Sequence, residues 1–164
     1  MAAGMQLRQV VVSRGAPGGR PQRILDVAAC DIAPGSRVAI MGPGGAGKST
    51  FARVITRLEH DSVGSVQWYI APGSAASPIG RPVVFVPQRA DAAMSCNTVR
   101  AEIGLALELA GVNGAALNDA VHRAITAMGL DGSVLDRDPL ALSGGERRRV
   151  AIAAALAVEP GMLV

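Results

Sequence analysis

One short stretch of the chain combines glycines, a lysine and hydroxyl side chains at a spacing that suits phosphate binding. It is GPGGAGKST and fits the pattern G-x-x-x-x-G-K-[ST], with Gly42, Gly47, Lys48 and Ser49 at the fixed positions. Glycines let the backbone turn sharply, so several backbone N–H groups can point at one anion. In this pattern the lysine reaches the outer phosphates of a nucleotide, and the serine hydroxyl binds Mg²⁺. The candidate nucleotide-binding residues are Gly42, Pro43, Gly44, Gly45, Ala46, Gly47, Lys48, Ser49 and Thr50.

The lysine of this stretch supports the same interpretation. Lys48 is the single lysine of the chain, and the other 15 basic residues are arginines. A lysine ammonium is a compact point charge, whereas an arginine guanidinium is a planar fork. The one lysine therefore stands where a point charge is needed. An ordinary glycine turn is the alternative, but the four fixed positions would match by chance in well under ~2% of such chains.

The residues around the loop predict the strand and the helix that must position it. Val38–Met41 is a short apolar run, typical of a strand buried on both faces. A helix is predicted from Lys48 to about Leu58, and the partial positive charge at its N-terminus favours anions. Strands that alternate with helices indicate an α/β fold. Further strands are predicted over residues 5–13, 23–33, 64–70, 83–88 and 162–164, and further helices over 98–128 and 146–158.

The segment between residues 89 and 138 reads as a helical insertion into this α/β core. Its pattern is helical from Thr98 to Met128, in two pieces divided at AGVNGAA. Asn97 or Thr98 is a plausible N-cap, and Glu102 falls in the opening turn. We therefore predict one domain, with a nucleotide-binding core at 1–88 and 139–164 and a helical subdomain at 89–138.

Composition limits the class of protein further. The chain has 164 residues, enough for one domain with its own core, and only 2% of them are aromatic. The net charge of +3 is too small to indicate nucleic acid as a partner. Two cysteines, Cys30 and Cys96, lack metal-ligand spacing. The longest apolar run, residues 150–158, is far shorter than the about 20 residues of a membrane span, so we expect a soluble chain.

A second motif points to a family. The segment LSGGE at residues 142–146, followed by RRRVAIAAALAVEP, resembles the signature motif and helix of ABC-type ATPases, the ATP-binding subunits of ABC transporters. VVFVPQ at residues 83–88 resembles their Q-loop, with Gln88 as its glutamine. The three motifs occur in the order of that family. The resemblance implies a P-loop NTPase (RecA-like) parallel-sheet core with N-terminal antiparallel strands and a helical insertion.

The resemblance also implies roles for single residues. Gln88 would contact Mg²⁺ and water and would couple the nucleotide site to the rest of the assembly. The signature of one subunit closes on the ATP held by the phosphate loop of another, so a head-to-tail pair would bury two ATP molecules. The implied Mg²⁺ ligands are Ser49 and Gln88. The residues implied to contact the partner's ATP are Ser143, Gly144, Gly145 and Glu146.

The signature also makes physical sense without the resemblance. Ser143, Gly144 and Gly145 open a predicted helix, so a hydroxyl and free N–H groups would point beyond its N-terminus and form a second anion site. The arginines at 147–149 oppose the helix dipole in its first turns. Either an anionic partner offsets that repulsion, or these arginines form a solvated face.

Within the family, the chain is most similar to the ATPases of energy-coupling-factor (ECF) importers. That resemblance implies ATP and Mg²⁺ as cofactors, with a second ABC ATPase subunit, alike or related, and a transmembrane scaffold as partners. It places the chain in the cytoplasm, on the inner face of the membrane, where ATP binding and hydrolysis drive solute uptake. The solute is not identified, because the ATPase does not touch it in this family. The residues that carry this finer resemblance are Thr98, Val99, Glu102, Ile103 and Gly104.

The chain departs from the family pattern at three places. Arg14 stands where an aromatic residue usually stacks on adenine, and a guanidinium can also stack on a base. Ala154 replaces an arginine after the signature. The carboxylates that hold Mg²⁺ and activate water in the family follow the strand that begins near Met162, and the alignment places them beyond Val164. We therefore expect a C-terminally truncated, incomplete ABC ATPase domain that is hydrolysis-deficient on its own.

Other interpretations stay open from the sequence. The chain could be a non-hydrolysing nucleotide-binding fragment or regulatory module, or the ATPase of another ABC importer class. A non-transport ABC protein, such as a translation factor or a chromosome-structure ATPase, is disfavoured by the short insertion without heptads. A mononucleotide kinase would leave LSGGE unexplained.

Overall fold

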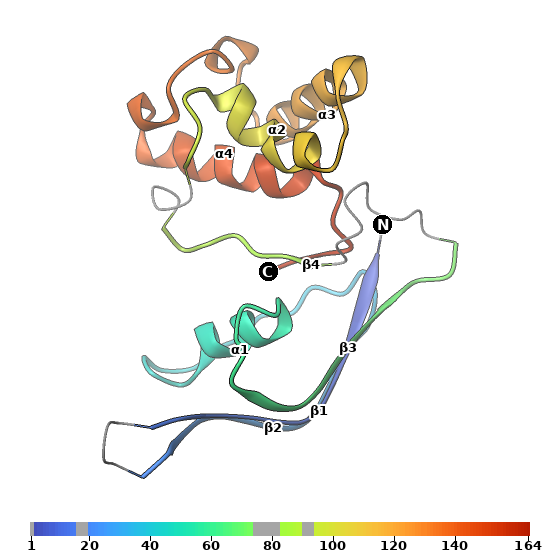
Figure 1. Cartoon of the computed structure of the whole chain (residues 1–164), viewed down its shortest axis with the longest axis vertical. Coiled ribbons are helices and arrows are strands. Elements are labelled where there is room, and N and C mark those ends of the chain that lie inside the picture. Colours follow the sequence, from blue (N-terminus) through green and yellow to red (C-terminus); the bar gives the residue numbers. More distant parts are fainter. Residues whose placement is uncertain (1, 16–19, 74–82, 90–93) are drawn as a thin grey trace. The chain divides into compact units, whose positions relative to one another are not determined.

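A computed structural model describes residues 2–15, 20–73, 83–89 and 94–164. Contacts within the chain define two compact units, Met1–Ala75 with Val164, and Ala76–Leu163. Figure 1 shows the strands of the first unit and the helices of the second. The sequence predicts a different division, into a core at 1–88 and 139–164 and a helical subdomain at 89–138, and that division stays a prediction. Residues 90–93 of the predicted subdomain lie outside the described residues.

The first unit is built on a three-stranded antiparallel sheet with the order β2-β1-β3. Its strands are β1 (Ala3–Arg14), β2 (Gln22–Ile32) and β3 (Ser62–Ile70). Leu7 on the central strand pairs with Cys30 on one side and Val66 on the other. The predicted N-terminal antiparallel strands are confirmed.

The buried face of β1 changes along the strand. Its most deeply buried large side chains are Met5, Leu7, Val10 and Val12. Successive strand residues point to opposite faces, so this change from odd to even numbers requires an irregularity. Gln9 supplies it with a φ of 51°, and the register between β1 and β3 shifts between Arg8 and Val11. Opposite lies Gly64, where a Cβ would come 2.3 Å from the Gln9 carbonyl oxygen.

The helix that follows the phosphate loop is α1 (Lys48–Ile55), and it ends three residues before the predicted Leu58. Arg57, just past its end, has a left-handed φ of 56°, which does not continue an α-helix. The Trp68 indole N–H donates to the Ile55 carbonyl oxygen at 3.0 Å. The Arg57 guanidinium lies 4.2 Å from the centre of the same indole ring. These contacts fix the C-terminal end of α1 to β3.

The predicted buried strand at Val38–Met41 is wrong. These residues are neither strand nor helix, and the Met41 side chain is 87% exposed. A strand needs a neighbouring strand to accept and donate its backbone hydrogen bonds. No described strand pairs with residues 38–41. The apolar run alone therefore did not determine a strand.

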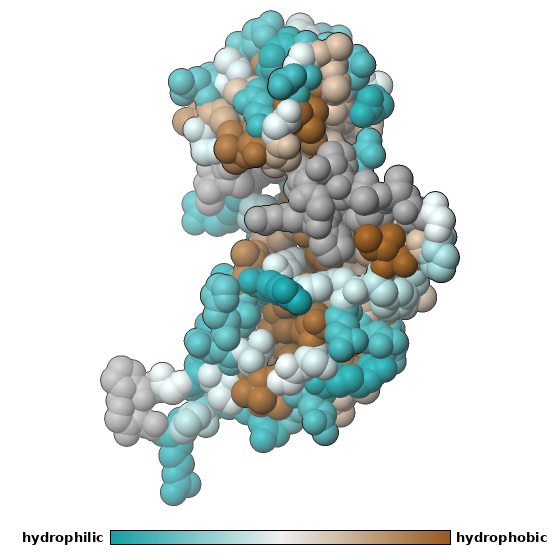
Figure 2. Space-filling view, turned by 45° about the vertical axis from the view of Figure 1, so that its right-hand side comes forward, coloured by the Kyte–Doolittle hydropathy of each residue, from teal (hydrophilic) through white to brown (hydrophobic). Residues whose placement is uncertain are grey.

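Apolar side chains reach the surface of both units (Figure 2). The exposed large apolar residues of the first unit are Val38, Ile40, Met41, Leu58, Val63, Tyr69 and Ile70.

The second unit is a cluster of three helices, α2 (Val99–Leu109), α3 (Gly114–Ala127) and α4 (Gly144–Ala157). The 3₁₀ turns η2 (Gly132–Val134) and η3 (Pro139–Ala141) connect α3 to α4. The helices bury one apolar core between them, as amphipathic helices do. The predicted helical insertion and signature helix are confirmed. The large side chains of this core with 1% exposure or less are Val99, Ile103, Leu107, Val121, Ile125, Leu135 and Val150.

A short parallel pair accompanies the helices of the second unit. β4 (Val83–Val84) pairs with β5 (Met162–Leu163), with Val83 opposite Met162 and Val84 opposite Leu163. Both strands are predicted from the sequence, although β4 is shorter than the predicted 83–88. Parallel neighbours require a crossover, which here includes α2, α3 and α4.

The described helices include none that could cross a bilayer. No helix in these ranges is both long and apolar enough for a membrane span.

Candidate nucleotide-binding site

The phosphate loop depends on Gly47, where both the backbone conformation and a close neighbour exclude a larger residue. Gly47 precedes α1 with a φ of 86°, in the left-handed region. A Cβ at Gly47 would lie 2.8 Å from the carbonyl oxygen of Ile24 in β2. Both the conformation and the close approach therefore require glycine. The contact fixes the loop against the antiparallel sheet.

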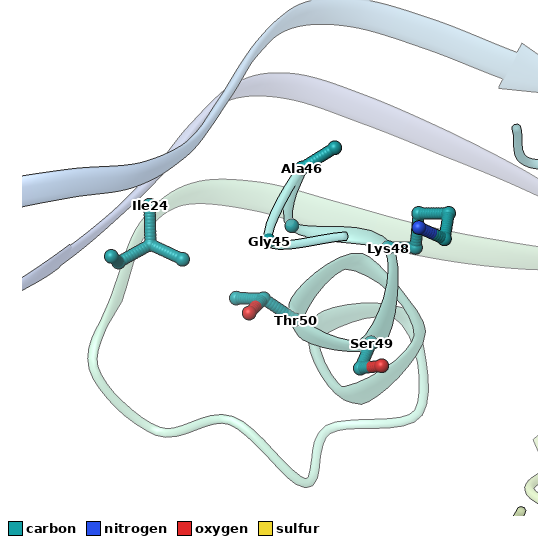
Figure 3. Close-up of a pocket in the computed structure, with 7 residues that line it drawn as sticks. Ile24, Gly45, Ala46, Lys48, Ser49 and Thr50 are labelled. Atoms are coloured by element: carbon teal, nitrogen blue, oxygen red, sulfur yellow. The ribbon is translucent and has the colours of Figure 1, made fainter. Parts of the chain in front are cut away.

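The loop and the first turn of α1 enclose a pocket of about 220 Å³. Thr50 extends from α1 toward Ile24, and Ser49 points to the other side of the turn (Figure 3). Ile24, on β2, also lines the pocket. The sequence did not predict it, because it lies on another strand, far before the motif in sequence. The pocket is lined by Ile24, Gly45, Ala46, Gly47, Lys48, Ser49 and Thr50.

Unpaired backbone donors make this pocket suitable for an anion. The first helical hydrogen bond of α1 runs from the Phe51 N–H to the Gly47 carbonyl at 2.8 Å. The N–H groups of Lys48, Ser49 and Thr50 come earlier, so no carbonyl within the helix accepts from them. The helix N-terminus has neither a side-chain cap nor an acidic residue in its first turn. Its partial positive charge is therefore available to a phosphate.

Lys48 lies over the loop and contacts its backbone. The Lys48 ammonium donates to the carbonyl oxygens of Gly42 at 2.9 Å and Pro43 at 2.8 Å. These two contacts use two of the three ammonium donors and leave one for a ligand. The loop thus holds the charge near its own N–H groups. Ser49 is exposed, so its hydroxyl is accessible to a metal ion, whereas Thr50 is buried.

The described residues contain no preformed protein cage for a metal. No group of three His, Cys, Asp or Glu side chains in these ranges could hold an ion. Mg²⁺ in nucleotide sites is often bound by few protein ligands together with phosphate oxygens. The exposed Ser49 hydroxyl beside the anion pocket fits one such ligand.

The structure places Arg14 at the end of β1, in an ion pair. Its guanidinium lies 2.9 Å from a carboxylate oxygen of Glu59, whose side chain is only 9% exposed. The guanidinium is thus held at this carboxylate. Its predicted contact with adenine stays a prediction.

The signature segment forms the N-terminus of α4, and its side chains cap one another. The Ser143 hydroxyl accepts from the Glu146 N–H, and the Ser143 N–H donates to the Glu146 carboxylate at 2.9 Å. The same hydroxyl donates a hydrogen bond to that carboxylate at 2.6 Å. This reciprocal capping box satisfies two backbone donors. The N–H groups of Gly144 and Gly145 remain at the helix end without an intrahelical acceptor.

The capping box changes the acidity of Glu146. The hydrogen bond from the Ser143 hydroxyl holds the pKa of the Glu146 carboxyl below its ordinary value. The Ser143 backbone N–H and the charges of Arg137 and Arg149 act in the same direction. The carboxylate therefore stays charged at neutral pH and occupies part of the anion-attracting end of α4.

Two of the arginines at 147–149 bind backbone oxygens. Arg147 donates to the carbonyl of Leu140 at 2.9 Å, and Arg148 donates to the carbonyl of Gln88 at 3.1 Å. The sequence left two explanations for these arginines, an anionic partner or a solvated face. Hydrogen bonds to backbone carbonyls are a third. They place cations in the first turns of α4, where the helix dipole disfavours them. The Gln88 side chain is exposed.

The chain matches the family described as ABC transporter over residues 25–164. It belongs to that family. The family match covers the phosphate loop, Gln88 and the signature, so the recognition made from the sequence motifs is confirmed.

Two curated ABC transporter relatives illustrate the likeness. The sulfate/thiosulfate import ATP-binding protein CysA of Thermosynechococcus vestitus is 42% identical over 134 residues, which are 82% of this chain and 39% of that protein. The methionine import ATP-binding protein MetN of Cereibacter sphaeroides is 34% identical over 152 residues, which are 90% of this chain and 42% of that protein. The chain thus spans less than half the length of these relatives.

A solved ABC structure has the same fold. The dimeric ATP-binding cassette MJ0796, in a post-hydrolysis state bound to ADP and Pi, aligns with a TM-score of 0.80 at 26% identity. The alignment covers 97% of this chain and 72% of that one. The ABC-type P-loop NTPase fold predicted from the sequence is confirmed.

The close approach of Gly47 to β2 predicts a pair of alanine variants with different stabilities. Gly47→Ala should lower the free energy of unfolding by at least about 1–2 kcal/mol, because alanine resists the left-handed backbone and its Cβ meets the Ile24 carbonyl. Gly44→Ala is the control, since a Cβ there meets nothing within 4 Å, and should change stability by less than ~0.5 kcal/mol. Urea unfolding followed by the fluorescence of Trp68 measures both. Equal effects would contradict the assigned role of Gly47.

The lowered pKa of Glu146 predicts how stability depends on pH. Its carboxylate stabilises the fold fully above the ordinary glutamate pKa of about 4.3, and this contribution disappears as pH falls through the lower folded-state pKa. Glu146→Gln should therefore unfold with a flatter loss of stability between about pH 5 and 3. Glu108→Gln, on the exposed face of α2, is the matched control. Urea midpoints followed by helical circular dichroism measure both, and an unchanged acid dependence in Glu146→Gln would refute the assignment.

Proposed function

We propose that this chain is the ATP-binding part of an ABC-type importer ATPase. The observation that carries the proposal is the pocket at the N-terminus of α1, where unpaired N–H groups and the Lys48 ammonium converge. Such a pocket suits the β- and γ-phosphates of a nucleotide. Relatives named as ATP-binding proteins of importers support the choice of ATP and of import.

Mg²⁺ is proposed as the second cofactor. When bound, it would neutralise charge on the phosphate oxygens and so favour phosphoryl transfer. From this chain, the Ser49 hydroxyl would hold the ion, and Gln88 would contribute through its exposed side-chain amide. Arg14 is proposed to contact adenine. For this, its guanidinium would either stack on the base while it stays paired with Glu59, or leave that ion pair.

The proposed partners are a second ABC ATPase subunit and a transmembrane permease or scaffold. Ser143, Gly144, Gly145 and Glu146 would face the ATP of the second subunit, and the two free glycine N–H groups supply donors for it. MJ0796, which this chain resembles at 26% identity, is dimeric. The corresponding location is the cytoplasmic face of the membrane.

The proposal names an ABC importer ATPase and does not extend to the ECF branch that the sequence suggests. The ECF assignment rests on residues that have structural roles in this chain. Thr98 accepts from the Ala101 N–H as the N-cap of α2, and the Glu102 carboxylate accepts the N–H groups of Ser95 and Cys96, both at 2.8 Å. Because folding of α2 already explains this pattern, it separates ECF ATPases from other importer ATPases only weakly, and the ECF branch stays a prediction. The reported relatives carry the names of sulfate/thiosulfate and methionine importers.

The phosphate loop predicts a specific loss of nucleotide affinity. Lys48→Ala should weaken ATP binding about 10- to 100-fold, because a charge-assisted contact to phosphate is lost. Arg53→Ala removes a positive charge from the last turn of the same helix and should change affinity less than about twofold. Titration with a fluorescent ATP analogue measures the difference. This method also detects weak binding, which is expected when no second subunit supplies its signature segment. Unchanged affinity in Lys48→Ala would refute the site.

Hydrolysis is proposed to need carboxylates that do not line this pocket. Phosphoryl transfer uses positioned carboxylates to hold Mg²⁺ and to activate water, and the residues that line the pocket carry none. The purified polypeptide 1–164 should therefore show no phosphate release above the Lys48→Ala background in a coupled assay with Mg-ATP. Steady turnover that Lys48→Ala abolishes would show that the carboxylates are not needed.

A further inference from the structure

The helix of the phosphate loop, α1, ends in a Schellman motif in which an arginine takes the position usual for glycine. The Arg57 N–H donates to the Val54 carbonyl at 3.1 Å, and the Leu58 N–H donates to the Arg53 carbonyl at 2.8 Å. These are the two hydrogen bonds that define the motif. Arg57 has the left-handed φ of 56° that the motif requires. Glycine adopts that conformation without strain, whereas a residue with a Cβ adopts it at a cost in energy.

The side chain of Arg57 makes a contact that can offset this cost. Its guanidinium carbon lies 4.2 Å from the centre of the Trp68 indole ring, within the range of a cation–π interaction. The N–H of the same ring donates to the Ile55 carbonyl oxygen at 3.0 Å. Ile55 is the last residue of α1, so its carbonyl has no donor within the helix. Trp68 therefore contacts the end of α1 twice, through its ring face and through its N–H.

The two ends of α1 are close enough to affect each other. Its eight residues span only about 12 Å, and a helix of that length is marginally stable by itself. Gly47 packs closely on β2 before the helix begins, and Trp68 on β3 holds the end. All of these residues belong to the first unit. The direction of α1 is thus defined by one contact at each end, and the unpaired N–H groups of its first turn point along that direction.

We propose that Arg57 and Trp68 form a clamp that positions α1 for phosphate binding, which makes both of them positioning residues. The inference rests on the proposed nucleotide-binding function. The clamp holds the last carbonyl of the helix, so the N–H groups at the other end keep the direction in which they meet the phosphates. A helix that is loose at its C-terminal end must instead be ordered when the ligand binds, and this ordering lowers the affinity.

The clamp also gives Trp68 a response to the ligand, because coupling between two events is reciprocal. If the clamp raises the affinity for ATP, bound ATP strengthens the clamp by the same factor. Trp68 is the single tryptophan of the chain, so its fluorescence reports on the clamp. Mg-ATP should therefore reduce the quenching of Trp68 by acrylamide.

The test compares variants of the full 164-residue chain by titration with a fluorescent ATP analogue. Arg57→Gly removes the guanidinium and also relieves the left-handed backbone, so its urea midpoint should stay close to the wild-type value. Its ATP affinity should nevertheless fall about three- to fivefold, the size of one cation–π contact. Arg57→Lys keeps a cation and should retain the affinity within about twofold. Arg53→Ala, which removes an exposed arginine from the last turn of the same helix, is the matched control for charge and should also stay within about twofold.

Two further measurements separate positioning from a contribution to stability alone. Trp68→Phe keeps a ring for Arg57 and removes the N–H that holds Ile55, and should weaken ATP binding about three- to fivefold. Acrylamide quenching of Trp68 should fall on addition of Mg-ATP in the wild-type chain and in Arg53→Ala, and should stay unchanged in Arg57→Gly. A contact that only stabilises the fold would leave the affinity and the ATP-dependent change in quenching as they are in the wild-type chain.

The outcomes distinguish the inference from the function on which it rests. Wild-type affinity in Arg57→Gly, or an ATP-dependent change in quenching that persists in it, would overturn the clamp. Equal losses in Arg57→Gly and Arg53→Ala would assign the effect to charge and would overturn it as well. Failure of the proposed function would be seen instead as ATP affinity that Lys48→Ala does not alter.

Discussion

The packing of Gly47 against the Ile24 carbonyl is the constraint on which the candidate site depends. A Cβ on Gly47 would lie 2.8 Å from that carbonyl oxygen, and the Gly47 backbone is in the left-handed region. From that fixed point α1 begins, its first N–H groups remain unpaired, and Lys48 extends back over Gly42 and Pro43. At its other end, α1 is held by Trp68. A short helix fixed at both ends presents its N-terminus in one place.

The two helix N-termini of the candidate sites differ in how their donors are used. At α1, no side chain caps the helix, so an incoming phosphate meets free N–H groups. At α4, Ser143 and Glu146 cap each other, and the ligand-facing donors are reduced to the two glycine N–H groups. A glutamate at this position adds a negative charge where a partner's phosphate is proposed to lie. The first site is therefore the stronger anion site within a single chain, and the second suits a contact that forms only in an assembly.

Much of the fold could be predicted because its signals are local. The alternation in β1 and the N-cap Thr98 of α2, with Glu102 in its first turn, are signals that lie within a few residues of the element they specify. The predicted strand at Val38–Met41 failed because a strand is a property of a pair, and an apolar run does not specify its neighbour. Thr98 and Glu102, on which the ECF prediction rests, also stabilise the start of α2, and the ECF branch stays a prediction.

The sequence by itself determined the phosphate loop, the signature and the family, because spacing along the backbone places a lysine, a hydroxyl and glycines at a helix start without help from the rest of the chain. Only the tertiary structure decided which partners these groups have. Ile24 entered the pocket through β2, Arg14 paired with Glu59, and Arg148 reached the carbonyl of Gln88. Each of these contacts joins residues more than twenty positions apart, and side-chain reach across such distances is set by packing, which a linear motif does not encode.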